Sequence, residues 1–114
     1  MTMRFDETDA FAKQFRRLSR KYRSLPDDLH EFKKVITVLP LGSGKHFAVL
    51  HGAERITIVK ARLFCRYLKG ATLRIIYAYR LEETAIDFIE IYFKGEQERE
   101  SRNLIRDFLR GVER

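Results

Sequence analysis

Apolar and polar residues alternate along the stretch 59–94, and this period of two predicts β-strands. Two short turns divide the stretch into three strands. The first strand has an apolar face of Val59, Ala61, Leu63, Cys65 and Tyr67 and a basic face of Lys60, Arg62 and Arg66. The second has an apolar face of Leu73, Ile75, Tyr77 and Tyr79, with Arg74 and Arg80 opposite. Each strand is therefore expected to bury one face.

The register of the first two strands follows from keeping their apolar faces together, because a slip of one residue would bury the arginines. We predict that Cys65 lies opposite Ile75. Arg66 then lies opposite Arg74, and a three-residue loop at 69–71 uses a glycine with positive φ. The shared basic face comprises Lys60, Arg62, Arg66, Arg74 and Arg80. Like charges on paired strands repel one another. This repulsion favours a face that binds an anion, although solvation or acidic neighbours also relieve it.

The third strand supplies acidic and aromatic neighbours to this face. If the turn at 81–83 keeps Ile89 beside Ile75, then Glu90 lies beside Arg74 and Tyr92 shares their face. The predicted constellation is Arg62, Arg66, Arg74, Glu90 and Tyr92.

Helical spacing of apolar residues occurs on both sides of the strand region. Residues 8–23 form an amphipathic pattern of Phe11, Phe15, Leu18 and Tyr22, with Asp6 or Thr8 as cap and a basic surface of Lys13, Arg16, Arg17, Arg20 and Lys21. Ser24 and Pro26 then start a second helix with a stripe of Leu29, Phe32, Val35, Ile36 and Leu39, which Pro40 stops. A last helix carries Leu104, Ile105, Phe108, Leu109 and Val112.

Together these patterns predict an α+β fold in one domain spanning residues 1–114. An N-terminal antiparallel helix hairpin packs on a small, mainly antiparallel sheet of three to four strands, and a C-terminal helix docks on the sheet. With 114 residues and 45% hydrophobic residues, the chain can bury a single core.

The composition narrows the partners and the chemistry. A formal charge of +7 favours an acidic or polyanionic partner. Cys65 is the only cysteine, which excludes an intramolecular disulfide and a thiolate zinc site. The segment 42–45 lacks the spacing of a phosphate-binding P-loop, and the three histidines lack ligand spacing, so neither a metal nor a cofactor is expected. No secretory signal or membrane span is visible, and we expect a cytoplasmic protein without membrane contact.

The order of these segments resembles the RelE/ParE toxin superfamily of bacterial toxin-antitoxin systems. The resemblance rests on Leu50-His51-Gly52, Lys60-Ala61-Arg62, Arg74-Ile75-Ile76-Tyr77 and the segment 87–94 that leads into the charged last helix. It covers nearly the whole chain. For RelE-like members it implies a ribosome-dependent mRNA endonuclease (mRNA interferase) that cleaves without metal, by attack of a ribose 2′-OH on the adjacent phosphate.

Such cleavage needs a base, an acid and cations for the developing charge. The resemblance matches Lys60, Arg62 and Arg74 to catalytic positions, and Lys94 to the basic residue that ends the last strand. Glu90 could accept the proton and Tyr92 could donate one or stack on a base; alternatively Glu90 neutralises Arg74 and Tyr92 packs under the last helix. The expected nucleic-acid-binding residues are Arg66, Lys69, Arg80, Lys94, Arg16, Arg17 and Arg20.

Two positions depart from the ribonuclease pattern and keep alternatives open. Gly95 stands where such members often carry arginine, and Ser101 stands near an expected tyrosine. The alternatives are a ParE-like, non-enzymatic inhibitor of DNA gyrase and an inactive RNA-binding module. In each case the resemblance implies a cognate antitoxin whose acidic or amphipathic segment covers the basic groove.

Overall fold

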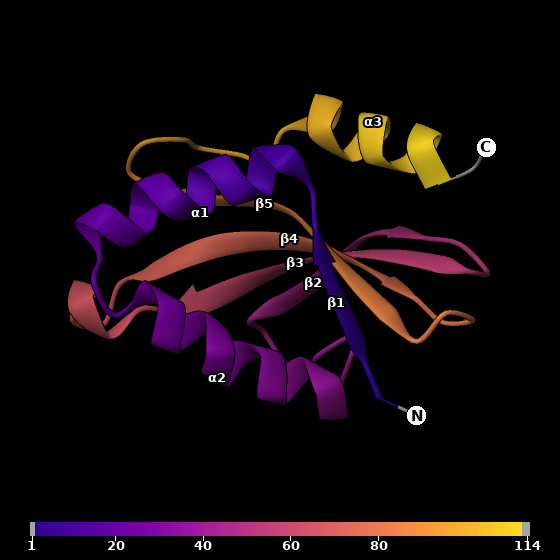
Figure 1. Cartoon of the computed structure of the whole chain (residues 1–114), viewed down its shortest axis with the longest axis horizontal. Helices are drawn as coiled ribbons and strands as arrows, with labels where there is room; N and C mark the ends of the chain where they lie inside the picture. Colours follow the sequence, from indigo (N-terminus) through magenta and orange to yellow (C-terminus); the bar gives the residue numbers. More distant parts are fainter. Residues whose placement is uncertain (1, 113–114) are drawn as a thin grey trace.

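A five-stranded sheet forms the centre of the computed structural model, which describes residues 2–112 (Figure 1). Along the chain the elements are β1 (Arg4–Glu7), α1 (Asp9–Lys21), α2 (Leu25–Val38), β2 (Phe47–Gly52), β3 (Ile56–Phe64), the 3₁₀ turn η1 (Arg66–Leu68), β4 (Thr72–Arg80), β5 (Ala85–Phe93) and α3 (Arg102–Val112). The strand order is β1-β5-β4-β3-β2. Only the β1–β5 pairing is parallel, so the sheet is mostly antiparallel.

The helices cover both faces of the sheet. α1 and α2 pack on one face over the larger core, which includes Phe11, Leu18, Phe32, Tyr77 and Phe88. α3 lies on the other face, where Leu104, Ile105, Phe108 and Leu109 contact a smaller cluster of Ile58, Ile76, Ala78 and Ile89. The predicted α+β class, with two N-terminal helices and a C-terminal helix, is confirmed.

The helix boundaries follow the sequence signals closely. The Thr8 hydroxyl accepts a 3.1 Å hydrogen bond from the Phe11 amide and caps α1, as predicted. Ser24 precedes α2 but its side chain does not cap the helix, because the hydroxyl oxygen accepts from the Tyr67 amide while the hydroxyl donates to Asp28. Val35 and Leu39 are about half exposed, at 48% and 47%, and thus do not belong to the buried stripe of α2.

The sheet has five strands rather than the predicted three to four. The additional β1 is four residues long, and of its side chains only Phe5 packs against the core. Four residues with one partly buried side chain are too few for a recognisable alternation. β1 is ordered by pairing with β5 along the sheet edge.

The predicted β3–β4 register is wrong by four residues. Arg74 lies opposite Arg62, not Arg66, and Ile75 lies opposite Ala61. The strand ends at Phe64, and the connection 65–71 contains η1 and a turn with Lys69 at φ 48° and Gly70 at φ 100°. Because the shift is even, every paired side chain keeps its predicted face.

The predicted β4–β5 register is wrong by two residues. Arg74 lies opposite Tyr92, and Ile75 lies opposite Ile91, while the pairing then jumps from Ile76–Glu90 to Tyr77–Phe88. The skipped Ile89 forms a β-bulge, which strict alternation does not anticipate. As a result Glu90 lies opposite Ile76 and not beside Arg74.

No described helix is both long and apolar enough to cross a membrane.

Candidate functional site

Arg62, Arg74 and Tyr92 form one row across the three central strands. Arg62 on β3 lies opposite Arg74 on β4, which lies opposite Tyr92 on β5. Arg62 is exposed and Arg74 half-buried, and the Arg74 guanidinium donates a 2.6 Å hydrogen bond to the Thr72 hydroxyl. Within residues 2–112 neither arginine forms an ion pair. Arg62 and Arg74, which we call the arginine row, thus place two cationic side chains on neighbouring strands of one face, and this arrangement favours an anion.

The neighbouring row contains Lys60, whose ammonium donates a 2.8 Å hydrogen bond to Glu100. This bond is the main cause that raises the pKa of Lys60, and it is also the main cause that lowers the pKa of Glu100. Both side chains are largely shielded from solvent, at 28% and 22% exposure. Glu100 was not predicted from the sequence. The only sequence feature that pointed to Glu100 was the acidic cluster before the last helix. Only the tertiary fold brings Glu100 next to Lys60.

Glu90 is held by the segment that leads into α3. Glu90 is only 1% exposed. One carboxylate oxygen accepts a hydrogen bond from the Ser101 amide at 2.8 Å, and the other accepts one from the Gln97 side chain at 2.7 Å. The Ser101 hydroxyl in turn accepts from the Leu104 amide, so Ser101 caps α3. Glu90 makes no ion pair with Arg74. A carboxylate with both oxygens engaged is a poor general base, and its position is that of an anchor for α3.

Tyr92 is buried beside Lys60 rather than presented to solvent. It is 3% exposed, and its hydroxyl forms no hydrogen bond within the described part of the chain. Burial raises the pKa of Tyr92, while the Lys60 charge acts in the opposite direction. A ring this deeply buried offers no face on which a nucleotide base could stack.

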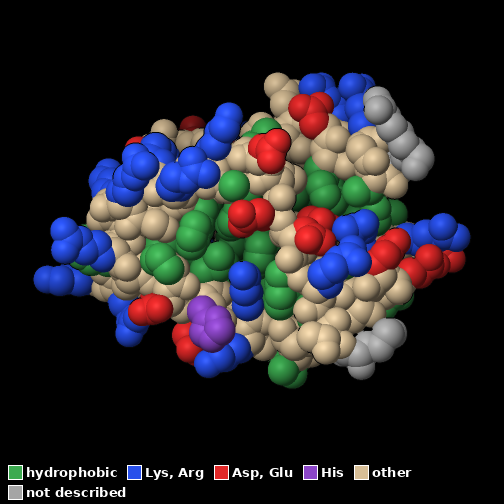
Figure 2. All heavy atoms as spheres, in the orientation of Figure 1, with side chains coloured by type: hydrophobic (Ala, Val, Ile, Leu, Met, Phe, Trp, Pro, Cys, Tyr) green, Lys and Arg blue, Asp and Glu red, His purple; other side chains and the backbone are tan. Residues whose placement is uncertain are grey.

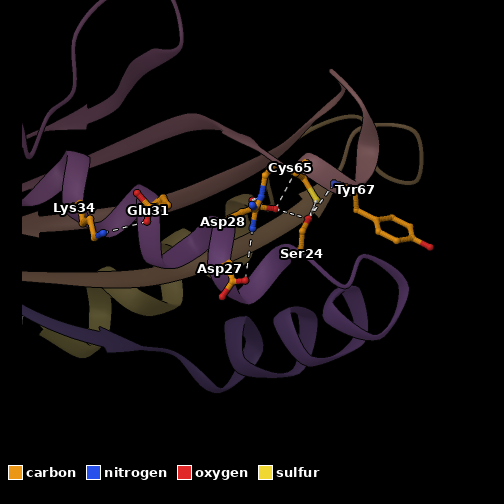
Figure 3. Close-up of polar contacts among 8 residues, drawn as sticks. Ser24, Asp27, Asp28, Glu31, Lys34, Cys65 and Tyr67 are labelled. Carbon is orange, nitrogen blue, oxygen red and sulfur yellow. Dashed lines mark hydrogen bonds and ion pairs between the residues drawn. The ribbon is translucent and has the colours of Figure 1, made fainter.

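Arg66 lies outside the arginine row, in the β3–β4 connection beside α2. Its guanidinium contacts Asp28 at 3.2 Å and Asp27 at 3.6 Å. The Ser24 hydroxyl donates to Asp28 and accepts from the Tyr67 amide, and it lies 3.5 Å from the Cys65 sulfur (Figure 3). This network ties the connection to the start of α2, so Arg66 has a structural role here.

Arg80 is likewise engaged elsewhere. It forms a two-point pair with Asp87 at 2.8 and 3.2 Å, with side-chain exposures of 19% and 10%. Burial raises the pKa of Asp87, and the Arg80 charge opposes that shift. Arg80 lies six positions after Arg74 along β4, a distance of about 20 Å. Arg80 shares the predicted face but is too distant to join the arginine row.

The remaining predicted cations are exposed at other places. Lys69 lies in the β3–β4 turn and Lys94 just after β5. Arg16, Arg17 and Arg20 are exposed on α1, and Figure 2 shows Lys and Arg side chains gathered over this helix. Arg17 contacts Glu96 at 3.3 Å. Because α1 and α3 cover opposite faces of the sheet, the α1 cations form a surface separate from the arginine row.

No metal-binding group is present among residues 2–112, where no three His, Cys, Asp or Glu side chains are suitably clustered.

Comparison with known proteins rests on structure. No family model matches the chain, and no curated protein sequence is significantly similar to it. Similar solved structures include the archaeal RelE–RelB complex from Pyrococcus horikoshii OT3, with a TM-score of 0.63 and 21% identity over 83% of this chain and 98% of the matched one. The structure of a double arginine-to-alanine mutant of E. coli RelE in the free state is also similar. It has a TM-score of 0.55 and 17% identity, over 86% of this chain and 90% of the matched one. Over most of its length, the chain thus has the fold of the RelE toxins.

Proposed function

We propose that this protein is a RelE-like toxin that cleaves messenger RNA in the ribosome. The observation that carries the proposal is the arginine row, in which Arg62 and Arg74 face each other without a carboxylate partner within residues 2–112. The RelE fold of the chain supports the same assignment. Two adjacent guanidinium groups suit the phosphodiester backbone of RNA, because each can donate two parallel hydrogen bonds to phosphate oxygens.

In the proposed reaction the ribose 2′-oxygen forms a bond to the adjacent phosphorus, and the bond from phosphorus to the 5′-oxygen breaks. The proton of the 2′-hydroxyl passes to a base, and the departing 5′-oxygen takes a proton from an acid. Arg62 and Arg74 stabilise the charge that develops on the phosphorane oxygens. These steps require neither a metal nor a cofactor.

The acid and base are proposed from the pair next to the arginine row. Lys60 is protonated at neutral pH, and in the proposal it supplies the proton to the 5′-oxygen; before substrate binds, its hydrogen bond to Glu100 raises its pKa. Glu100 is the nearby carboxylate that can accept the 2′-hydroxyl proton once the substrate separates it from Lys60. Glu90 is not assigned this role, because both of its oxygens are occupied.

The proposed partners are the ribosome with its mRNA and a cognate antitoxin, all cytoplasmic. The exposed Arg16, Arg17 and Arg20 of α1, with Lys69 and Lys94, offer further cations to ribosomal or messenger RNA. An antitoxin is proposed by analogy with the archaeal RelE, which was crystallised with RelB.

A second candidate function is the non-enzymatic inhibition of DNA gyrase. The observation in its favour is that Glu90, the carboxylate expected to serve as base, is buried and fully hydrogen-bonded. A protein that only binds its target needs no base. An inactive RNA-binding module would have the same surface charges.

The deciding experiment is inducible expression of the wild type, Arg74→Ala and Arg74→Lys in bacteria, with growth followed and transcript 5′ ends mapped. Arg23→Ala is the matched control, since it removes an exposed arginine between α1 and α2. We expect growth arrest and new in-frame cuts with the wild type and control, lost in Arg74→Ala and weakened in Arg74→Lys. Arrest with intact transcripts and blocked supercoiling would favour the gyrase function, and normal growth with folded protein the inactive module.

A further inference from the structure

Phe64, the last residue of β3, presents an aromatic ring to solvent beside the arginine row. It is 57% exposed, and among residues 2–112 only Phe64 and Tyr67 are aromatic residues that lie mostly open to solvent. Burial of a Phe side chain is normally favourable, so this ring leaves a large apolar surface uncovered. An apolar surface next to cations fits a ligand that has both an apolar face and a negative charge.

Strand alternation and pairing place the Phe64 side chain on the face of the arginine row. Phe64 follows Arg62 by two positions, so both side chains leave β3 on one face, about 7 Å apart along the strand. Phe64 lies opposite Thr72, whose hydroxyl accepts the 2.6 Å hydrogen bond from Arg74. Phe64 is therefore also the diagonal neighbour of Arg74. One aromatic ring and two cations thus occupy adjacent positions of the sheet.

His46, just before β2, positions the Phe64 ring. The centroids of the imidazole and the phenyl ring are 5.2 Å apart, and the two ring planes are inclined by 82°. This edge-to-face packing restricts the rotation of the Phe64 side chain. The contact still leaves more than half of Phe64 open to solvent. The ring is therefore both positioned and accessible.

Phe64 also lines a cavity of about 620 Å³ between α2 and β3. The charged lining of this cavity is mainly acidic, with Asp27, Asp28 and Glu31 against Arg66. Carboxylates repel phosphate groups, whereas the arginine row attracts them. A phosphate-bearing ligand on Phe64 is therefore oriented with its phosphate toward the arginine row.

A nucleobase of single-stranded RNA has the required properties. Every base has a flat π face that stacks on an aromatic side chain, and the ribose connects that base to a phosphate. Exposed aromatic residues on an antiparallel sheet are a known means of holding RNA bases. An apolar side chain of a protein would cover the ring but would leave both arginines without an anion.

We propose that one RNA base stacks on Phe64 while its neighbouring phosphate lies over the arginine row. The inference rests on the toxin function proposed above and adds to it a residue that holds the base beside the reacting phosphate. The sequence pointed to Tyr92 for stacking, but that ring is buried, and the exposed ring on the same face is Phe64. Because any base can stack on a phenyl ring, Phe64 sets the position of the strand and accepts all four bases.

The test uses the intact protein and a single-stranded RNA oligonucleotide whose 2′-O-methyl groups prevent attack on the phosphate. The fluorescent base 2-aminopurine is placed at each position in turn, because its emission falls when it stacks on an aromatic ring. We expect quenching at one position with the wild type, lost in Phe64→Leu and retained in Phe64→Trp. Fluorescence anisotropy of a labelled oligonucleotide should show at least about fivefold weaker binding by Phe64→Leu.

Tyr67→Leu is the matched control. Tyr67 is similarly exposed, at 54%, but it belongs to η1, where its amide donates to Ser24 and its ring points away from that contact (Figure 3). This variant should leave quenching and affinity nearly unchanged. The slope of log affinity against log salt concentration should stay the same in Phe64→Leu, because no phosphate contact is lost, and should decrease in Arg62→Ala. Circular dichroism verifies that every variant is folded.

The inference is overturned by absence of RNA binding, by equal losses of affinity in Phe64→Leu and Tyr67→Leu, or by quenching that persists in Phe64→Leu. Its failure is distinguishable from failure of the toxin function, because no readout uses ribosomes or cleavage. Quenching that depends on Phe64, together with intact transcripts in cells, supports stacking and contradicts the cleavage function. Cut transcripts together with quenching that persists in Phe64→Leu contradict stacking alone.

Discussion

Lys60 and Glu100 form a 2.8 Å ion pair that links β3 to the segment preceding α3. Forty residues separate them in the chain, and the pair lies next to the arginine row. Together with the bonds from Gln97 and Ser101 to Glu90, it attaches this segment to the sheet at two places. The candidate site and the docking of α3 are consequently coupled.

Glu100→Gln should lower the free energy of unfolding at neutral pH by about 1 kcal/mol, because it removes a charge-assisted hydrogen bond. The pKa of Glu100 is lowered from an ordinary value of 4.5, so this stabilisation is present above that pH and is lost as pH falls through the folded value. The pKa of Lys60 is raised from 10.5, so the loss at the alkaline end begins only above that pH. Urea unfolding at about pH 7 and about pH 3 measures the difference, which should shrink at the lower pH; a difference independent of pH would contradict the pairing.

Glu90→Ala should destabilise the protein by about 2–3 kcal/mol, because it leaves the Ser101 amide and the Gln97 side chain without their buried acceptor. The loss should be concentrated at α3. Hydrogen exchange should therefore quicken at the α3 amides more than in β4. If Glu90 were instead a general base, Glu90→Gln would abolish cleavage while unfolding stayed as in the wild type.

Arg62→Ala should weaken RNA binding without destabilising the fold. The Arg62 side chain is exposed and lies opposite a like charge. Its removal should therefore leave the free energy of unfolding unchanged or raise it by about 0.2–0.5 kcal/mol. Titration of an RNA oligonucleotide at several salt concentrations gives the slope of log affinity against log salt concentration. In Arg62→Ala this slope should be smaller in magnitude by the equivalent of about one phosphate contact. An unchanged salt dependence would remove Arg62 from the interface.

Tyr92→Phe should not lower stability and should raise it by up to about 1 kcal/mol, because it removes a buried hydroxyl without a described hydrogen-bond partner. Guanidinium unfolding provides the measurement. A substantial loss of stability would show that the hydroxyl is bonded to Lys60 in solution. Reduced RNA cleavage at undiminished stability would assign the hydroxyl to the reaction.

Arg80→Met should cost about 3 kcal/mol of stability and leave RNA binding unchanged. The substitution removes the partner of the largely buried Asp87, although the raised pKa of that carboxyl makes protonation a partial relief. The measurement is thermal unfolding of Arg80→Met and of Arg74→Met. Because Arg74 has no ion-pair partner among the described residues, only the first variant should lose this stability. Weakened RNA binding by folded Arg80→Met would extend the interface to that end of the sheet.

Local patterns sufficed for the helices and for the two faces of the central strands. Thr8 was predictable as a cap, and Phe11 and Leu18 as buried residues, because capping and amphipathicity depend on neighbours within a few turns. The common face of Arg62 and Arg74 followed from alternation alone. Alternation specifies only whether two residues share a face, so every even shift of register satisfies it equally.

The sequence by itself thus determined the fold class, the helices and the basic face. Only the tertiary structure decided the neighbours on that face, through η1 between β3 and β4 and the bulge at Ile89. It also brought Glu100 to Lys60, Ser101 to Glu90 and Asp87 to Arg80. The physical reason is that strand pairing and helix docking are settled by loop geometry and core packing over the whole chain, where a short window of sequence carries no distance information.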